Sequence, residues 1–254
     1  MVSENSQFPN TCTEKLLLKR PDSCFECCLC ISDISFLNLK EKRRLFLHPK
    51  ELAYFDSLRF ERRQKSFLLG RFCAKQALSA FLQESDMTKI SVHHGVFEHP
   101  VVQYSKGKGV QISISHCDHC GGAIAFPEEH PMAIDLEKID PRKRDVILTQ
   151  CTPEEFKLIQ SLPIPETTQL TLLWTVKESL SKVLKCGLMT PFKIFEIKEV
   201  ESESDCFFWT FRKFAQYKVI SFVIGNTACS IITPKKTKLM INVKALKKHF
   251  QNSD

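Results

Sequence analysis

The short stretch Met132–Glu137, with the sequence MAIDLE, constrains this chain more than any other part of it. Successive side chains of a β-strand point to opposite faces, so the apolar residues are predicted to face a core while Asp135 and Glu137 share the other face. Two carboxylates one pleat apart repel each other, and burying them unpaired is costly. Two interpretations stay open at this point. The stretch is either a solvent-facing edge strand with ordinary surface acids, or a site for a hard divalent cation such as Mg²⁺, which prefers oxygen ligands.

Length and composition are those of a globular protein without a membrane segment. The 254 residues suffice for one large domain or two small ones, and 43% hydrophobic with 26% charged residues is an ordinary balance. The chain has no run of about 18 apolar residues, and its polar N-terminus lacks the features of a signal peptide. We therefore expect a cytoplasmic protein with no membrane partner.

The charge of the chain favours an acidic or phosphate-bearing partner. Lysine and arginine number 36 against 29 acidic residues, which gives a net charge of +7. A nucleic acid would also suit this charge, but the sequence contains no zinc finger, no aromatic RNA-binding signature and no long basic run. We therefore expect no nucleic-acid partner and retain nucleic-acid binding only as a less favoured alternative.

Twelve cysteines raise the question of a metal site or disulfides. Cys24–Cys30 contains a CxxCCxC cluster, and His116–Cys120 contains a second cluster of two histidines and two cysteines. A structural zinc site usually pairs two knuckles separated by roughly a dozen residues or more, and the first cluster has no adjacent second knuckle. It fits a buried strand with thiols as small fillers equally well, so reduced, buried cysteines are the preferred expectation over zinc.

The pattern along the chain predicts an α+β fold made of two similar halves, residues 1–128 and 129–254. Each half runs roughly from helix to strands, and the proline-bounded segment Pro127–Pro131 is the predicted link. The predicted helices lie at about 35–44, 50–55, 58–82, 152–162, 170–185 and 242–250. Thr152 is the predicted N-cap of the fourth, with Pro153 at its first helical position. The predicted strands lie at about 24–34, 110–115, 123–126, 132–137, 192–200, 206–214, 217–224 and 228–233, with two further short strands within 90–104.

The predicted helix 58–82 carries cations in four-residue steps or their multiples. They are Arg59, Arg63, Arg71 and Lys75, which would form a basic ridge that winds slowly round the helix. The alternative is an ordinary solvated face. Gly70 lies in the middle of this helix, where glycine costs about 1 kcal/mol relative to alanine, so we expect another group to pack closely against it.

A third carboxylate lies on the predicted helix 170–185. Trp174, Glu178 and Lys182 are spaced by four residues and fall close to one face. A plain surface Glu–Lys pair would be worth only a few tenths of a kcal/mol. The acidic pair of the strand, and an upstream strand that ends in Ser115-His116, favour a functional interpretation instead.

Taken in order, four stretches resemble the signature blocks of the 4′-phosphopantetheinyl transferases, in the large, internally duplicated type. The stretches are Gly70–Leu78 (GRFCAKQAL), Ile112–His116 (ISISH), Ala133–Glu137 (AIDLE) and Trp174–Lys182 (WTVKESLSK). The resemblance implies a pseudo-twofold α+β fold with coenzyme A and Mg²⁺ in a cleft between the halves. One departure concerns Ala133, which stands where the family usually has glycine.

The resemblance also implies a role for each matching residue. Three carboxylates would hold Mg²⁺, with Mn²⁺ as an alternative: Asp135, Glu137 and Glu178. Lys182 would contact the pyrophosphate, and Ser115 with His116 would hold the 3′-phosphate of coenzyme A. The turn at Pro100 would lie against the adenine. The anionic end of coenzyme A would also meet the basic residues Arg59, Arg63, Arg71 and, more weakly, Lys75.

The implied activity is transfer of 4′-phosphopantetheine from coenzyme A to a serine of an apo acyl or peptidyl carrier protein. Glu178 would assist as the base and Lys182 would stabilise the transition state, with release of 3′,5′-ADP. The partner would present an acidic helix, which the net positive charge favours, and the enzyme is expected to be a monomer. The alternative is a non-catalytic protein on the same fold that binds coenzyme A or a carrier protein.

Overall fold

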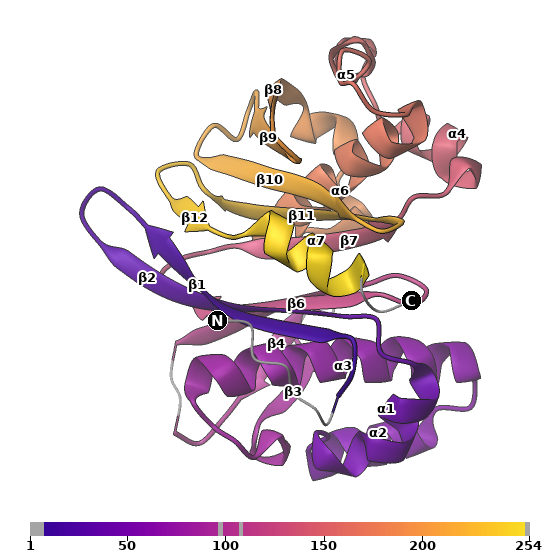
Figure 1. The fold of residues 1–254 in the computed structure, drawn as a ribbon, viewed down its shortest axis with the longest axis vertical. Coiled ribbons are helices and arrows are strands. Elements are labelled where there is room, and N and C mark those ends of the chain that lie inside the picture. Colours follow the sequence, from indigo (N-terminus) through magenta and orange to yellow (C-terminus); the bar gives the residue numbers. More distant parts are fainter. Residues whose placement is uncertain (1–7, 96–98, 107–108, 252–254) are drawn as a thin grey trace. The chain divides into compact units, whose positions relative to one another are not determined.

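The computed structural model describes residues 8–95, 99–106 and 109–251. The chain divides into two compact units (Figure 1). Unit 1 comprises Met1–Pro131 and Lys238–Ile241, and unit 2 comprises Met132–Thr237 and Asn242–Asp254. Each unit combines a five-stranded antiparallel sheet with helices, which confirms the mixed helix-and-sheet prediction. Within the described part of the chain, no helix has the length and apolar character needed to cross a membrane.

Unit 1 is built on a sheet with the strand order β12-β1-β2-β6-β5. The strands are β1 (Thr11–Lys19), β2 (Cys24–Ser32), β5 (Val110–His116), β6 (Gly121–Pro127) and β12 (Lys238–Met240). The long helix α3 (Glu61–Leu82) lies along one face of this sheet (Figure 1). The unit also contains α1 (Phe36–Lys42), α2 (Pro49–Ser57), the hairpin of β3 (Ser91–His94) and β4 (Pro100–Gln103), and short 3₁₀ turns at Arg43–Leu45 and Met87–Lys89.

Unit 2 is built on a sheet with the order β7-β11-β10-β9-β8. The strands are β7 (Ala133–Lys138), β8 (Ile197–Glu203), β9 (Cys206–Phe211), β10 (Tyr217–Ile224) and β11 (Thr227–Pro234). The long helix α6 (Glu166–Leu184) packs against β7 and β11, and α7 (Val243–Gln251) packs against β10. The shorter elements are η4 (Pro141–Lys143), α4 (Arg144–Thr149), α5 (Pro153–Ile159), η5 (Gly187–Met189) and η6 (Phe192–Phe195).

Local sequence signals account for most of these elements. Helix α1 starts close to the predicted position, and Ser35 caps it with a side chain that accepts a hydrogen bond from the backbone of Asn38. Thr152 caps α5, and proline occupies the first helical position, as predicted. The cysteine-rich stretch forms β2, in which Cys27, Cys28 and Cys30 are buried, so the prediction of a strand there is confirmed.

Several element boundaries differ from the prediction. Helix α3 begins at Glu61 and not at Leu58, so Arg59 precedes the helix. The expected strand 192–200 begins only at Ile197, because Phe192–Phe195 forms a 3₁₀ turn after Pro191 whose first and last side chains are buried. Strands β1 and β12 were not predicted. They pair with each other across more than two hundred residues of sequence, a contact that no local pattern indicates.

Candidate functional site

The acidic strand β7 has both of its faces buried at its centre. Asp135 pairs in register with Ser230 of β11, and Ala133 on the same face belongs to the core that includes α6. The acidic side chains therefore lie on the helix-covered face, while Ile134 and Leu136 are buried on the other. Asp135 is only 4% exposed, so the interpretation of a solvent-facing edge strand is wrong. Ile134 and Leu136 are buried, as predicted for the apolar face. The face of β7 that packs against α6, however, is the one that carries Asp135 and Glu137.

Ala133 fits this strand without strain. It pairs with Ile232 and is 1% exposed beneath α6. It is not among the non-glycine residues with positive φ, so the position does not need the conformational freedom of glycine. The departure from the family pattern therefore leaves the strand intact.

Lys182 supplies the countercharge for Asp135. Its Nζ lies 2.7 Å from Oδ1 of Asp135 and donates a second hydrogen bond of 3.0 Å to the carbonyl oxygen of Ile134. The lysine side chain is 28% exposed and the aspartate side chain 6%. This charge-assisted contact between α6 and β7 removes most of the cost of burying the carboxylate.

Glu137 has a different countercharge, Lys143 of η4. The two side chains form an ion pair in which Lys143 is 45% exposed and Glu137 25%. Burial raises the pKa of Glu137 and the charge of Asp135 raises it further, while the hydrogen bond from Lys143 lowers it. Sequence reasoning did not single out Lys143, which lies between Arg142 and Arg144 in the sequence.

Glu178 lies one helical turn before Lys182 on α6. Its pKa is raised to about 7, first by burial and then by the negative charges of Asp135 and Glu137, with Lys182 opposing the shift. Among the residues that the structure describes, its carboxylate forms no ion pair. The three carboxylates predicted to act together are therefore close enough to perturb one another.

The donor set of this cluster suits a hard cation, although its present arrangement is that of ion pairs. Three carboxylates are the ligands that Mg²⁺ prefers, and the ammonium of Lys182 already holds a cationic position against Asp135. Over residues 8–95, 99–106 and 109–251, no three His, Cys, Asp or Glu side chains are arranged to hold a metal ion. Binding a divalent cation would require a lysine to move away from its carboxylate.

In unit 1, His116 ends β5 against helix α3. Its Nε2 lies 2.9 Å from the hydroxyl oxygen of Ser66, and a Cβ added to Gly70 would lie 3.2 Å from its Cδ2 and 3.3 Å from Cγ2 of Ile114. The predicted close packing against Gly70 is therefore confirmed. Ser115 is buried, and strand alternation directs it to the face opposite His116. The two residues expected to share one phosphate leave the strand on opposite faces.

The predicted basic residues do not form one ridge. Arg59 and Arg63 are exposed, whereas Arg71 is 6% exposed and Lys75 is fully buried. The ammonium of Lys75 lies 2.7 Å from Oε2 of Glu51 and donates to the carbonyl oxygen of Ile90. Burial lowers the pKa of Lys75 and of Arg71. Lys75 thus holds Glu51 in place from within the core of unit 1.

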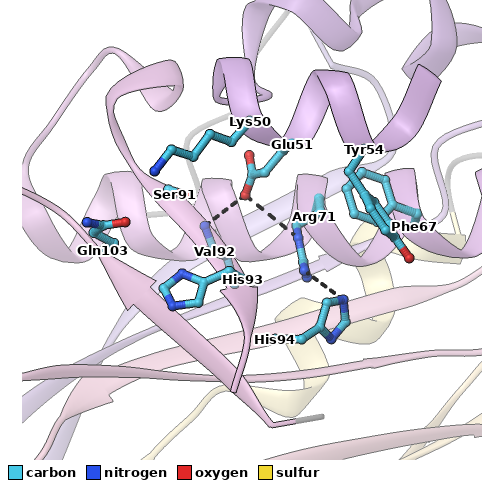
Figure 2. Close-up of a pocket in the computed structure, with 10 residues that line it drawn as sticks. All are labelled: Lys50, Glu51, Tyr54, Phe67, Arg71, Ser91, Val92, His93, His94 and Gln103. Carbon is cyan, nitrogen blue, oxygen red and sulfur yellow. Dashed lines mark hydrogen bonds and ion pairs between the residues drawn. The ribbon is translucent and has the colours of Figure 1, made fainter. Parts of the chain in front are cut away.

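A pocket of about 390 Å³ opens beside this pair (Figure 2). It is lined by Lys50, Glu51, Tyr54, Phe67, Arg71, Ser91, Val92, His93, His94 and Gln103. Figure 2 shows Arg71 between Glu51 and His94, with its Nε 3.7 Å from Oε1 of Glu51 and its Nη2 3.3 Å from Nε2 of His94. The guanidinium also lies 5.0 Å from the centre of the Phe67 ring. The pocket therefore presents cations beside aromatic rings.

Pro100 lies next to this pocket. It is the first residue of β4 and pairs with His94 across the β3–β4 hairpin. Glu98, two residues before Pro100 in the sequence, lies outside the described residues. Sequence reasoning missed the pocket residues Tyr54 and His94. The signal that could have indicated this region is the sequence His48-Pro-Lys-Glu51, whose glutamate closes a capping box on α2.

Comparison with known proteins finds a family model that is similar to part of the chain. Residues 131–232 match the family model of the 4′-phosphopantetheinyl transferase superfamily, which confirms the predicted resemblance for this segment. The segment contains Asp135, Glu137, Glu178 and Lys182, while the residues singled out in unit 1 lie outside it.

Two solved structures are similar to part of the chain. A holo-(acyl-carrier-protein) synthase from Bacillus anthracis, in complex with CoA (3′,5′-ADP), is 21% identical over 44% of this chain and 96% of its own, with a TM-score of 0.35. A holo-ACP synthase from Plasmodium yoelii is 19% identical over 47% of this chain and 94% of its own, with a TM-score of 0.30. No curated protein matches the sequence.

Proposed function

We propose that this protein transfers the 4′-phosphopantetheine group of coenzyme A to a serine of an apo acyl or peptidyl carrier protein. The observation that carries the proposal is the convergence of Asp135, Glu137, Glu178 and Lys182 on the shared face of β7 and α6. All four lie in the segment that matches the 4′-phosphopantetheinyl transferase superfamily. The reaction forms a bond from the serine oxygen to the β-phosphorus of coenzyme A and breaks the bond to 3′,5′-ADP.

The carboxylates would hold Mg²⁺, or Mn²⁺ in its place. When bound, the cation neutralises charge on the phosphates as the transition state forms. Lys182 leaves Asp135 and contacts the same phosphates, adding a second positive centre. The serine hydroxyl is a weak nucleophile and needs a base within reach. Glu178, which lies beside the carboxylates of β7, accepts its proton.

Unit 1 would bind the 3′-phosphoadenosine end of coenzyme A. The rings of Tyr54 and Phe67 lie 5.1 Å apart at the pocket and offer apolar surface to an adenine. Arg71 and the nearby His94 offer hydrogen bonds to a phosphate. The exposed Arg59 and Arg63, with Ser115 and His116 at the end of β5, are the further candidates for the 3′-phosphate. Lys75 is enclosed, so it supports this site through Glu51.

The two units would be copies of one ancestral unit related by pseudo-twofold symmetry, with the boundary near residues 128–132. In unit 1 the strands β2, β6 and β5 are neighbours beside α3, and in unit 2 the strands β7, β11 and β10 are neighbours in the same order beside α6. Each long helix also follows a short helix that starts with proline and a capping box. These parallels support the large, internally duplicated type of transferase.

The proposal extends to the partner and the setting of the enzyme. A carrier protein with an acidic recognition helix suits the net charge of +7. We propose that the enzyme is a monomer, since the two copies of the unit are already joined in one chain. We also propose that it is cytoplasmic.

The proposal is tested by incubating the protein with coenzyme A, Mg²⁺ and a panel of apo carrier proteins. Intact mass spectrometry should show one phosphopantetheine group on the serine of at least one carrier. Glu178→Gln and Asp135→Asn should abolish this transfer. Glu154→Gln, which changes an exposed glutamate of α5 in the same unit, is the matched control and should leave it unchanged.

Two results would contradict the proposal. Unchanged masses for every carrier, with coenzyme A still bound, would indicate the non-catalytic binding protein instead. Normal transfer by Glu178→Gln would remove Glu178 from the mechanism and leave the role of base to another group.

A further inference from the structure

We propose that Lys143 competes with the divalent cation for Glu137 and thereby sets the cation affinity of the carboxylate cluster. The inference rests on the proposed function, because it concerns one of the three carboxylates assigned to the cation. Lys143 has no part in the transfer chemistry described above, yet its ammonium forms an ion pair with Glu137. A cation that binds Glu137 must replace that ammonium.

The turn that carries Lys143 is held in a fixed conformation. Asp140 accepts a hydrogen bond of 3.0 Å from the backbone of Arg142, and its two carboxylate oxygens bind the guanidinium of the same arginine. The backbone N–H of Lys143 donates to the carbonyl oxygen of Asp140 at 3.1 Å. These contacts close η4 directly after β7, so the lysine side chain reaches back to a carboxylate six residues earlier.

The two lysines of the cluster are held with different strength. Lys182 is 28% exposed and binds both Asp135 and a backbone carbonyl, so moving it breaks two hydrogen bonds. Lys143 is 45% exposed and has Glu137 as its acidic partner. An exposed ammonium that leaves its carboxylate is rehydrated by water, and such pairs are weak. Lys143 is therefore the lysine that yields first to an incoming cation.

Removing the charge of Lys143 should tighten cation binding. Glu137 would then have no ammonium to release, and the net charge around the carboxylates would be more negative by one elementary charge. A partly exposed ion pair of this kind corresponds to about a two- to fivefold change in a dissociation constant. Lys143→Gln is therefore expected to lower the Kd for Mn²⁺ by about that factor.

The test measures Mn²⁺ binding to the full chain by electron paramagnetic resonance of free Mn²⁺, without coenzyme A or carrier protein. Lys143→Gln should bind Mn²⁺ more tightly than the wild type. Lys143→Arg keeps the charge and should bind as the wild type does. Lys157→Gln, which removes an exposed lysine of α5 in the same unit, is the control for net charge and should also match the wild type.

Asp135→Asn locates the measured site and separates the failure of this inference from that of the proposed function. It should weaken Mn²⁺ binding. An unchanged or weaker affinity in Lys143→Gln, with Asp135→Asn still disruptive, would overturn the inference about Lys143 alone. Mn²⁺ binding that Asp135→Asn does not weaken would overturn both this inference and the assignment of the carboxylates to a cation.

Discussion

Each unit contains a short helix whose third residue is a buried glutamate, and in each unit this glutamate binds a buried lysine of the long helix. In unit 1, Glu51 of α2 accepts hydrogen bonds from the backbone N–H of His48 at 2.9 Å and of Val92 at 2.8 Å. The ammonium of Lys75 on α3 lies 2.7 Å from the same carboxylate. One carboxylate thus joins two helices and the first strand of the hairpin that follows them.

Unit 2 repeats this arrangement with other residues. Glu155 of α5 accepts hydrogen bonds of 2.9 Å from the backbone N–H of Thr152 and of Ile197, the first residue of β8. The ammonium of Lys177 on α6 lies 2.7 Å from its Oε2. Both carboxylates are therefore satisfied by two backbone donors and one lysine, as a buried charge requires.

We call this arrangement, a buried glutamate of the short helix paired with a buried lysine of the long helix, the shared frame. The units differ in what surrounds it. In unit 1, Arg71 provides a second cation 3.7 Å from Glu51, and the pair borders a pocket. In unit 2, Glu155 is fully buried and Lys177 also binds the carbonyl oxygen of Gln150. The same frame thus positions a cationic, aromatic pocket in unit 1, whereas in unit 2 it is sealed.

The inner faces of the long helices differ as well. On α3, the thiol of Cys73 contacts the thiol of Cys30 on β2, and burial raises its pKa far above the usual range. On α6, Lys182 contacts Asp135 on β7 instead. Counted from the two buried lysines, Lys182 corresponds to Ala80, so this charged contact of α6 has no charged counterpart on α3. The two units therefore share the buried glutamate–lysine pair but differ in whether the long helix makes a second ion pair with the sheet.

The largest expected effect comes from breaking the buried pair of unit 2. Lys177→Met should lower the unfolding free energy by about 4 kcal/mol, because it leaves Glu155 as an uncompensated buried charge. Lys75→Met should cost less, about 2 kcal/mol, because Arg71 remains near Glu51. Urea unfolding can be followed in unit 2 by tryptophan fluorescence, since Trp174 and Trp209 both lie there.

Unit 1 is followed in the same experiment by hydrogen exchange of the β3 amides. Lys157→Met, at an exposed position of α5, is the control and should change the unfolding free energy by less than about 0.5 kcal/mol. Equal decreases in unfolding free energy for Lys177→Met and Lys75→Met would show that Arg71 does not compensate for Lys75. The two buried pairs would then be energetically equivalent.

A second prediction concerns the charge that unit 2 has and unit 1 lacks. The residue after Lys177 is Glu178, whereas the residue after Lys75 is Gln76. The pKa of Glu178 is raised from 4.5 to about 7, so the folded protein holds this proton more tightly than the unfolded chain. The stability that the protonated group contributes is complete below pH 4.5 and is lost as the pH rises to 7.

Glu178→Gln removes this pH dependence of stability and places a glutamine after Lys177, as Gln76 follows Lys75 in unit 1. In the presence of a chelator, the variant should be more stable than the wild type above pH 7, by at most about 3 kcal/mol. The difference should vanish below pH 4.5, where both side chains are neutral. A stability difference that does not vary with pH would show that desolvation and the charges of Asp135 and Glu137 do not act on Glu178.

The sequence predicted those features of the site that depend on local period and chemistry. Strand alternation brought Asp135 and Glu137 to one face, and helical spacing put Glu178 and Lys182 on one row of α6. Each inference required only the residues of a single element. The capping of α5 by Thr152 was predicted for the same reason.

Features that depend on packing between distant segments were not predicted. Lys75 is indistinguishable in sequence from a surface lysine, and only its contact with Glu51 shows why it is buried. Strand β12 pairs with β1 across most of the chain. Lys143 reaches Glu137 because the turn at Asp140 reverses the chain, a geometry that the basic cluster alone did not indicate.

The smallest expected change in stability lies in unit 1, at Gly70. Gly70→Ala gains about 1 kcal/mol of helix propensity, but the new Cβ would lie 3.2 Å from Cδ2 of His116 and 3.3 Å from Cγ2 of Ile114, so these side chains must shift. The net change in unfolding free energy should stay within about 1 kcal/mol. Displacement of the imidazole should nevertheless weaken binding of 3′,5′-ADP by about threefold or more in calorimetry. Unchanged affinity at unchanged stability would mean that His116 does not contact the ligand, and that unit 1 binds it through the Arg71 pocket alone.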